Sequence, residues 1–346
     1  MKYSITMKQW LLLGTLFLAT FAASFLYSTP GSVISPLSGD THPVSRIVPA
    51  LNKKVNTYTL HDGANPFIKT VSAEDTYNDA SAYIITNYDT GDIIAEKNSK
   101  KRLSIASLTK VMTAIVALDL ASPHDLFTVS RTASLIIPTK IGVKPGEKLS
   151  LNELLHASLI TSANDAAEVI KNGINRKYGY DIFVKAMNEK ARLLGLEDSH
   201  FSNPQGFDSE DNYSTVRDLA VLSHYALTEY PEIAEIVKKD YRRLTANHDH
   251  RRFDLYNWNG LLGVYPNVFG VKIGNTRDAG TTTIVGAERE NKRVLTVVLG
   301  ATNVLQRDLW ASELLDAGFE EISGLKPVAV TKRQLQDKYA TWKFWN

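Results

Sequence analysis

The hydrophobic residues of the chain change their spacing several times, and each spacing predicts a different kind of element. Residues 82–98, AYIITNYDTGDIIAEKN, form two apolar runs on either side of the turn-forming sequence 89–92. Such a pair of runs predicts a β-hairpin. The next segment, residues 104–121, carries apolar residues at helical spacing, namely Ile105, Leu108, Met112, Ile115 and Leu118. This spacing predicts a core helix.

Helical and strand patterns then follow in separate blocks. Helical spacing continues in residues 151–160, 164–174, 180–195, 214–227 and 306–322. The fourth of these opens with Thr215 and Asp218 at the spacing of a capping box. Strand patterns return in residues 267–274, 280–288 and 293–301, with a polar turn at 289–292. This order predicts an α+β fold, in which helices flank an antiparallel sheet and a further set of helices forms an all-helical lobe.

The N-terminus has the pattern of an export signal. Lys2 and Lys8 precede an apolar run from Trp10 to Leu26, and no charged residue occurs between Lys8 and Asp40. The run has the length of either a long signal peptide or a single membrane anchor, and both interpretations stay open. In both cases the lysines favour an N-terminus inside the cell and the rest of the chain outside it. We therefore assign residues 1–27 to a signal peptide or anchor, and the polar, proline-containing residues 28–78 to a spacer.

Composition narrows the possible functions. The chain has 346 residues with 39 basic and 37 acidic side chains, so its net charge gives no reason to expect a nucleic-acid partner. It has no cysteine, which excludes disulfides, thiolate catalysis and cysteine-ligated metals. His248 and His250 are close in sequence, but no third ligand has a supporting spacing, and we expect an exposed strand or loop there rather than a metal site. No metal and no organic cofactor is predicted.

Three short motifs suggest serine chemistry. Ser107 and Lys110 are three residues apart near the start of the predicted helix, so they share one face of it. A lysine can act as a base for a serine nucleophile if burial and nearby positive charge keep it partly neutral. Ser162 and Asn164 follow one helix and begin another, so both side chains would project from a turn between helices. Lys272 stands before Gly274 at a strand end.

Serine-x-x-lysine, serine-x-asparagine and lysine-x-glycine in this order form the motif set of the penicillin-recognising serine acyl-transferases. Longer segments extend the likeness, including LLHASLITSANDAAEVI, FSNPQGFDSEDNYSTVRDLAVLS and GVKIGNTRDAGTTTIVGAERENKRVLTVVLGA. From about residue 80 to residue 323 the chain resembles the D-alanyl-D-alanine carboxypeptidases, the low-molecular-weight penicillin-binding proteins. The resemblance implies the penicillin-binding protein and β-lactamase-like transpeptidase fold for residues 79–325. Residues 326–346 are then a short C-terminal tail, too short for the separate β-domain of many members.

The resemblance also implies roles for individual residues. Ser107 would attack the carbonyl of the D-Ala-D-Ala bond, and Lys110 would accept its proton. Ser162 and Lys272 would pass a proton to the departing D-alanine, and Asn164 would hold the peptide. The further substrate-binding residues implied are Gly274, Asn275 and Arg307. The backbone N–H groups of Ser107 and Asn275 would form the oxyanion hole.

The chain departs from the family pattern at Ile273, where the family has threonine. The threonine hydroxyl ordinarily helps to bind the terminal carboxylate of the substrate, and isoleucine cannot donate a hydrogen bond. Arg307 lies where the family has an arginine that binds the same carboxylate, so its guanidinium would remain as the main anion receptor.

The predicted function is a D,D-carboxypeptidase that acts on peptidoglycan stem peptides ending in D-Ala-D-Ala and is acylated by β-lactams. Two alternatives stay open because of Ile273. One is a D,D-endopeptidase that cuts a cross-link, and the other is a catalytically weakened peptidoglycan- or penicillin-binding homologue. A β-lactamase is disfavoured because no recognisable motif supplies a deacylating glutamate. Membrane contact is expected through the N-terminal segment if it is not cleaved.

Overall fold

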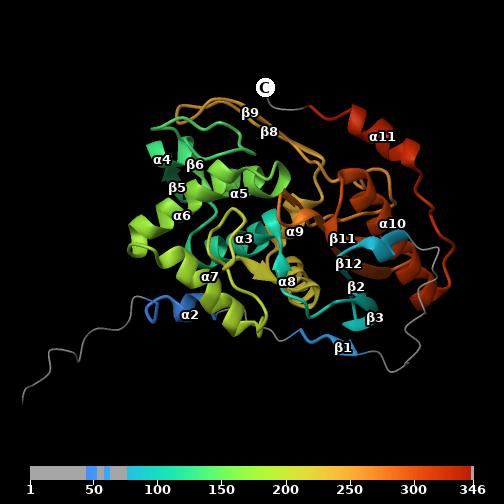
Figure 1. Cartoon of the computed structure of the whole chain (residues 1–346). Coiled ribbons are helices and arrows are strands. Elements are labelled where there is room, and N and C mark those ends of the chain that lie inside the picture. Colours follow the sequence, from blue (N-terminus) through green and yellow to red (C-terminus); the bar gives the residue numbers. More distant parts are fainter. Residues whose placement is uncertain (1–43, 53–57, 63–75, 344–346) are drawn as a thin grey trace, which may run out of the picture. The chain divides into compact units, whose positions relative to one another are not determined.

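Residues 44–52, 58–62 and 76–343 are described by the computed structural model of the protein. The chain divides into two units, residues 1–41 and residues 42–346, and the described residues belong to the second unit (Figure 1). The predicted export signal therefore lies outside the described residues. Within the described ranges, no helix has the length and apolar character needed to cross a bilayer.

A six-stranded sheet forms the centre of this unit. Its strands are β1 (His61–Asp62), β2 (Ala82–Asn87), β3 (Asp92–Lys97), β10 (Lys272–Thr276), β11 (Gly280–Arg289) and β12 (Lys292–Ala301). Their order across the sheet is β1-β3-β2-β12-β11-β10, and every neighbouring pair is antiparallel except β1 and β3. Strand β10 therefore lies at one edge of the sheet. One side of its backbone pairs with β11, and the other side pairs with no strand of this sheet.

Alternate residues of the strands enter two different hydrophobic cores. Ile84 of β2 belongs to the core beneath the helical lobe, whereas Tyr83 and Ile85 belong to the core under helix α10 (Val304–Ser323). The alternation follows from strand geometry, because successive side chains point to opposite faces of the sheet. Since both faces are covered, β2 reads as a nearly continuous apolar run.

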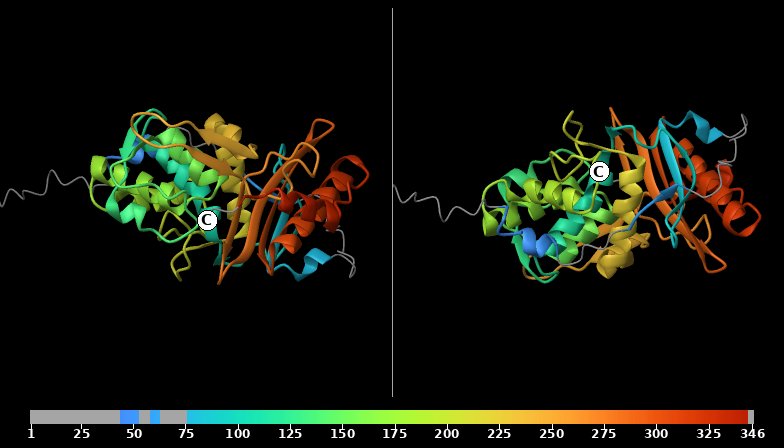
Figure 2. Two further views of the ribbon diagram at one scale, coloured as in Figure 1. Left: turned by 90° about the horizontal axis from the view of Figure 1, so that it is seen from above. Right: turned by 90° about the horizontal axis from the view of Figure 1, so that it is seen from below.

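Helices cover both faces of the sheet. The helical lobe contains α3 (Thr109–Leu120), α5 (Leu151–Ile160), α6 (Asn164–Tyr178), α7 (Ile182–Leu193), α8 (Val216–Glu229) and α9 (Pro231–Val237). Figure 2 shows these helices on one side of the sheet, and α10 with the C-terminal α11 (Lys332–Ala340) on the other. The predicted α+β architecture is confirmed.

Element boundaries show where the sequence patterns were right and where they were wrong. The hairpin at 82–98 forms as predicted, and Thr215 caps α8 by accepting a hydrogen bond from the Asp218 backbone N–H (3.1 Å). The strand predicted at 267–274 begins only at Lys272, because Gly270 adopts a positive φ of +49° that no regular strand contains. The helix predicted at 104–121 begins as the short 3₁₀ helix η2 (Ala106–Leu108) before α3.

Several short elements have no clear pattern in the sequence. The missed strand pairs are β4 (Leu103–Ser104) with β7 (Tyr213–Ser214), β5 (Leu126–Thr128) with β6 (Lys148–Ser150), and β8 (Tyr241–Leu244) with β9 (Phe253–Tyr256). The short helix α4 (Arg131–Ser134) was also missed.

Three pieces of the predicted spacer and part of the predicted tail belong to the folded unit. Leu51 of helix α2 (Val48–Leu51) and Ile47, which precedes the helix, pack into the helical core, and β1 pairs with β3. A short 3₁₀ helix, η1 (Thr76–Asp79), precedes β2. In the tail, α11 buries Leu335 against the core under α10.

Candidate active site

Ser107 and Lys110 lie where η2 passes into α3, beside the edge strand β10. Lys110 Nζ is 2.8 Å from Ser107 Oγ. Ser107 is half-buried, whereas Lys110 is completely buried. The three-residue spacing thus yields the hydrogen-bonded serine and lysine that the sequence predicts.

Lys110 has two further partners, and both are oxygens. Its Nζ donates to Asn164 Oδ1 (2.8 Å) and to the backbone carbonyl of Gln205 (2.6 Å). Burial lowers the pKa of Lys110 to about 7, although the nearby Asp165 carboxylate acts in the opposite direction. An amine with this pKa is partly neutral at pH 7, and loss of one proton leaves a lone pair for the Ser107 hydroxyl.

Ser162 lies in the turn between α5 and α6, and Asn164 is the first residue of α6; their side chains contact the two buried lysines, Lys272 and Lys110. Ser162 Oγ accepts a hydrogen bond from Lys272 Nζ (2.8 Å), which also donates to the Ile273 carbonyl (2.8 Å). Ser162 has a φ of +63°, and Ala106, which precedes Ser107, has a φ of +49°. Left-handed backbone costs on the order of 1 kcal/mol for a residue with a side chain and is concentrated at functional sites.

Lys272 is the second buried lysine of the site. Burial is the main reason that its pKa lies well below the ordinary value, and the charges of Lys110 and Arg307 lower it further. Two buried ammonium groups close to each other repel, so protonation of one disfavours protonation of the other. Of the two lysines, Lys110 has the pKa, about 7, that lets it exchange a proton near neutral pH.

Gly274 allows β10 to approach the nucleophile. A Cβ atom at this position would lie 2.9 Å from Ala106 Cβ and 3.0 Å from the Ser107 backbone nitrogen. Thr282 Oγ1 would be closer still, at 2.6 Å, so a side chain at this position would require the strand or η2 to shift. Ile273 is nearly buried on the same strand, and Asn275 is exposed.

Arg307 is buried at the start of α10, but its guanidinium is already paired. Its Nε and Nη2 lie 2.7 and 2.9 Å from the two carboxylate oxygens of Asp308, and Nη2 also donates to the Trp258 carbonyl (3.1 Å). The fork that the sequence analysis assigns to a substrate carboxylate is thus occupied by an internal carboxylate. Nη1 is the guanidinium nitrogen that forms no hydrogen bond with any described residue.

Three polar residues near Lys110 were missed by the sequence analysis. Gln205 supplies the carbonyl that Lys110 contacts, and its side-chain Nε2 donates to the buried Glu168 Oε2 (2.6 Å). Glu168 also pairs with Lys171 (2.8 Å). The Asp165 carboxylate, whose pKa is raised by burial, accepts backbone N–H groups of residues 141–143 and holds that loop beside Asn164. Glu168 and Gln205 lie in segments that carry the family resemblance, but no motif marks them.

The sequence predicts an exposed His250, but the side chain is buried, with only 4% of its surface exposed. It lies in a loop, one of the two kinds of structure expected there. Its Nε2 lies 3.0 Å from Glu153 Oε1, and its Nδ1 lies 2.7 Å from the Arg251 carbonyl. The exposed His248 does not join it. Among residues 44–52, 58–62 and 76–343, no group of three or more histidine, aspartate and glutamate side chains lies together as metal ligands do.

Comparisons with known proteins agree with this geometry. The family described as D-alanyl-D-alanine carboxypeptidase matches residues 69–303. DacF of Bacillus subtilis is 32% identical over 249 residues, which cover 70% of this chain and 63% of DacF. DacC of Escherichia coli is 31% identical over 271 residues, which cover 74% of this chain and 66% of DacC. The chain thus spans slightly less than two thirds of the length of these curated relatives.

Solved structures show the same similarity. Penicillin binding protein 5 from Haemophilus influenzae matches with a TM-score of 0.64 and 28% identity, over 69% of this chain and 70% of that one. The Streptomyces K15 DD-transpeptidase matches with a TM-score of 0.64 and 25% identity, over 77% of this chain and 99% of that one. The extent of the family match and the shared fold lead to one conclusion: the chain belongs to the D-alanyl-D-alanine carboxypeptidase family.

Proposed function

We propose that the protein is a serine D,D-carboxypeptidase, which removes the terminal D-alanine of peptidoglycan stem peptides through a Ser107 acyl-enzyme. The observation that carries the proposal is the 2.8 Å contact between Ser107 Oγ and the buried Lys110 Nζ, in a chain of this family. Buried lysines of lowered pKa serve as bases, and serine needs a base to become a nucleophile. Acylation of the same serine by β-lactams follows, because their strained amide reacts with the same nucleophile.

In the first step Ser107 Oγ attacks the carbonyl carbon of the scissile amide, and neutral Lys110 accepts the hydroxyl proton. The backbone N–H groups of Ser107 and Asn275 would stabilise the oxyanion, each worth about 3 kcal/mol in sites of this kind. The close approach at Gly274 supports this assignment, since it brings β10 to the Ser107 backbone nitrogen.

In the second step the carbon–nitrogen bond breaks and the departing amine takes up a proton. Ser162 and Lys272 are suited to deliver it, because Lys272 Nζ contacts Ser162 Oγ at 2.8 Å. The ester on Ser107 is then hydrolysed by water, which regenerates the serine. Asn164 would hold the substrate amide, and the peptide would add to the open edge of β10 as a further strand.

Two measurements on the full chain test the proposal. We expect a fluorescent penicillin to label the protein and a D-Ala-D-Ala pentapeptide to release D-alanine. Peptide mapping of the labelled protein by mass spectrometry should locate the acyl group on Ser107. A protein that neither takes the label nor releases D-alanine would refute the proposal, whereas labelling without release supports the catalytically weakened homologue.

The pKa of Lys110 predicts the pH dependence of acylation. With a pKa of about 7, the neutral base is the minor form at pH 6 and the major form at pH 8. Since only the unprotonated amine accepts the serine proton, the second-order rate constant for penicillin acylation should rise about tenfold from pH 6 to pH 8. Stopped-flow measurements with a fluorescent penicillin would test this rise, and a rate independent of pH in that range would contradict it.

Replacing Ile273 with threonine should increase the rate of D-alanine release. In Ile273→Thr a hydroxyl returns to the wall that faces the substrate carboxylate, where a hydrogen bond to a charged group is worth about 1.5–3 kcal/mol. D-Alanine release should rise about ten- to a hundredfold. Ile273→Val is the matched control, since it keeps a β-branched apolar side chain without the hydroxyl and should behave like the wild type. Equal release by the two variants would show that the hydroxyl does not contribute.

The location proposed for the protein is the cell envelope, outside the cytoplasm, where the family functions. The positive residues before the apolar N-terminal run support this orientation. The N-terminal segment would hold the protein at the membrane if it is not cleaved.

A further inference from the structure

The Lys110 amine is held by two carbonyl oxygens, and their positions determine where its lone pair points. Lys110 Nζ lies 2.8 Å from Asn164 Oδ1 and 2.6 Å from the backbone carbonyl oxygen of Gln205. A neutral amine has two N–H donors and one lone pair, because it has lost one of the three protons of the ammonium group. When these two oxygens accept both donors, the lone pair is left for the third neighbour, Ser107 Oγ, at 2.8 Å. The two oxygens therefore orient the base toward the serine hydroxyl.

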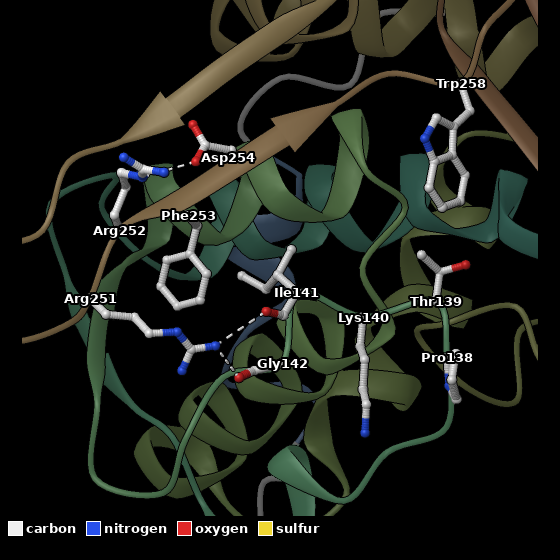
Figure 3. A pocket seen from close by; sticks show the side chains of 10 residues that line it. All are labelled: Pro138, Thr139, Lys140, Ile141, Gly142, Arg251, Arg252, Phe253, Asp254 and Trp258. Atoms are coloured by element: carbon white, nitrogen blue, oxygen red, sulfur yellow. Dashed lines mark hydrogen bonds and ion pairs between the residues drawn. The ribbon is translucent and has the colours of Figure 1, made fainter. Parts of the chain in front are cut away.

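The first of these oxygens, on the side chain of Asn164, is held by the loop at residues 137–143. The Asn164 backbone N–H donates to the Thr139 carbonyl (2.7 Å), and Asn164 Nδ2 donates to the Ile137 carbonyl (3.2 Å). Figure 3 shows Thr139 and Ile141 in this loop, which forms one wall of a cavity of about 580 Å³. Asn164 is thus held in place by main-chain oxygens of a neighbouring loop.

The second oxygen, the Gln205 carbonyl, is held by a carboxylate on α6. Gln205 Nε2 donates to Glu168 Oε2 (2.6 Å), and the two residues are 3% and 7% exposed. Glu168 follows Asn164 by four residues, so both lie on the same face of α6. This face of the helix therefore supplies both groups that orient Lys110. Asn164 contacts the amine directly, whereas Glu168 reaches it through Gln205.

The loop that carries Gln205 packs closely against the nucleophile. A Cβ atom at Gly206 would lie 1.9 Å from the Ala106 carbonyl oxygen, and the Gln205 carbonyl oxygen lies 3.4 Å from Ser107 Oγ. A buried amide that loses its acceptor carries a large desolvation cost. Without the Glu168 carboxylate, the Gln205 side chain would turn toward another acceptor or toward water, and its backbone carbonyl would be displaced with it.

From these contacts we infer that Glu168 is a positioning residue for the general base and acts through the side chain of Gln205. The inference rests on the proposed function, in which Lys110 is that base. The role of Glu168 is geometric rather than electrostatic. The carboxylate whose charge raises the pKa of Lys110 is Asp165. The charge of Glu168 is balanced by Lys171, whose Nζ lies 2.8 Å from Glu168 Oε1.

Three substitutions in the full chain test this inference by the rate of penicillin acylation. Glu168→Ala removes the acceptor of the Gln205 amide, and the rate constant should fall about tenfold because the base is misaligned but still present. Glu168→Gln keeps an oxygen acceptor without the charge and should stay within about threefold of the wild type. Lys171→Met is the matched control, because it removes the ion pair and leaves the Gln205 contact. It should change the rate constant less than about twofold.

The pH profile of acylation separates positioning from a loss of stability. The Gln205 carbonyl accepts a hydrogen bond that favours the ammonium form of Lys110, so displacement of this carbonyl lowers the pKa of Lys110. In Glu168→Ala the midpoint of the pH profile should therefore shift to lower pH by about one pH unit, while the plateau rate at high pH falls. A variant that is only less stable would keep the wild-type midpoint.

Gln205→Ala tests the same contact from its other side, because it keeps the main-chain carbonyl but frees it from the carboxylate. Alone, it should reproduce the tenfold loss and the shifted midpoint, and a wild-type profile would refute the positioning role even if Glu168→Ala does not fold. In the Gln205→Ala background, Glu168→Ala should change the rate constant by less than about twofold. A further tenfold loss there would show that Glu168 does not act through Gln205.

The outcomes distinguish failure of this inference from failure of the proposed function. If the wild type is labelled and releases D-alanine, but Glu168→Ala keeps the wild-type rate and midpoint, the positioning role is refuted and the carboxypeptidase stands. An equal loss in Lys171→Met and Glu168→Ala would assign the effect to the ion pair and overturn the role of the Gln205 contact. If the wild type shows neither labelling nor release, the proposed function fails and the positioning role fails with it.

Discussion

In Ser107→Ala we expect penicillin labelling to disappear and D-alanine release to fall by on the order of 10⁶-fold, the loss measured when a serine hydrolase loses its nucleophile. The reason is that, within residues 44–52, 58–62 and 76–343, no hydroxyl other than that of Ser107 is both accessible and in contact with a buried lysine of lowered pKa. Ser162 also contacts a lysine, but it is buried and its partner Lys272 is held by the Ile273 carbonyl as well. Its role as a second nucleophile is therefore disfavoured.

The measurement is gel fluorescence after labelling, together with enzymatic detection of released D-alanine. Ser104→Ala is the matched control, because Ser104 is half-buried on β4, three residues before the nucleophile. The control should keep wild-type labelling, and both variants should unfold at the wild-type temperature, since each loses a single hydroxyl. Persistent labelling of Ser107→Ala would mean that the acyl group forms elsewhere, and the proposed catalytic roles would have to be reassigned.

The three motifs could be predicted to lie together, although they are far apart in the sequence, because their order along the chain matches that of a family with a shared active site. Ser107 and Lys110 share one helical turn, and Lys110 contacts Asn164 across 54 positions of sequence. The hairpin at 82–98 and the strands at 280–301 were predictable for a simpler reason. Each is a long apolar run bounded by polar turn residues, and Glu290 and Asn291 both adopt the positive φ of a tight hairpin turn.

The missed features depend on contacts that no local pattern encodes. The start of β10 depends on a backbone turn at Gly270. Strands β8 and β9 have only four residues each, and three of the four side chains of β8 are exposed, so β8 has no apolar alternation. Arg307 could be placed near the site, but not its pairing with the adjacent Asp308. Neighbours in a helix do not usually face each other, so this contact had no signal in the sequence.

The pairing of Arg307 with Asp308 changes how the electrostatics of the site should be understood. A free guanidinium near Lys272 would attract the substrate carboxylate strongly, whereas two nitrogens of the paired Arg307 are already bonded to Asp308, although its charge still lowers the pKa of Lys272. The unusual residues of the cleft are then the two buried lysines, whose pKa values are both lowered. In the mechanism that we propose, the chemistry would depend on neutral amines more than on a strong cationic receptor.

Replacing Lys110 with methionine tests that dependence most directly. Methionine fills a similar volume without a titratable group, so in Lys110→Met the base is lost while the helix α3 remains packed. We expect the acylation rate constant to fall by about 10²–10⁴-fold, the usual contribution of a general base. The rise of the remaining rate between pH 6 and pH 8 should also disappear, which loss of stability alone would not cause. Stopped-flow kinetics across this pH range would measure both effects.

Lys190 provides the matched control, because it is also a completely buried helical lysine but lies away from the site. Its Nζ contacts the Leu51 carbonyl (2.6 Å), Tyr225 Oη (2.8 Å) and Asp119 Oδ2 (2.9 Å). Lys190→Met leaves the Asp119 carboxylate without its cation, so the free energy of unfolding should fall by about 3–5 kcal/mol. The folded protein should still be acylated at the wild-type rate with the same pH profile. If Lys190→Met lost acylation as Lys110→Met does, the effect at Lys110 would reflect general destabilisation, and the assignment of Lys110 as the base would be wrong.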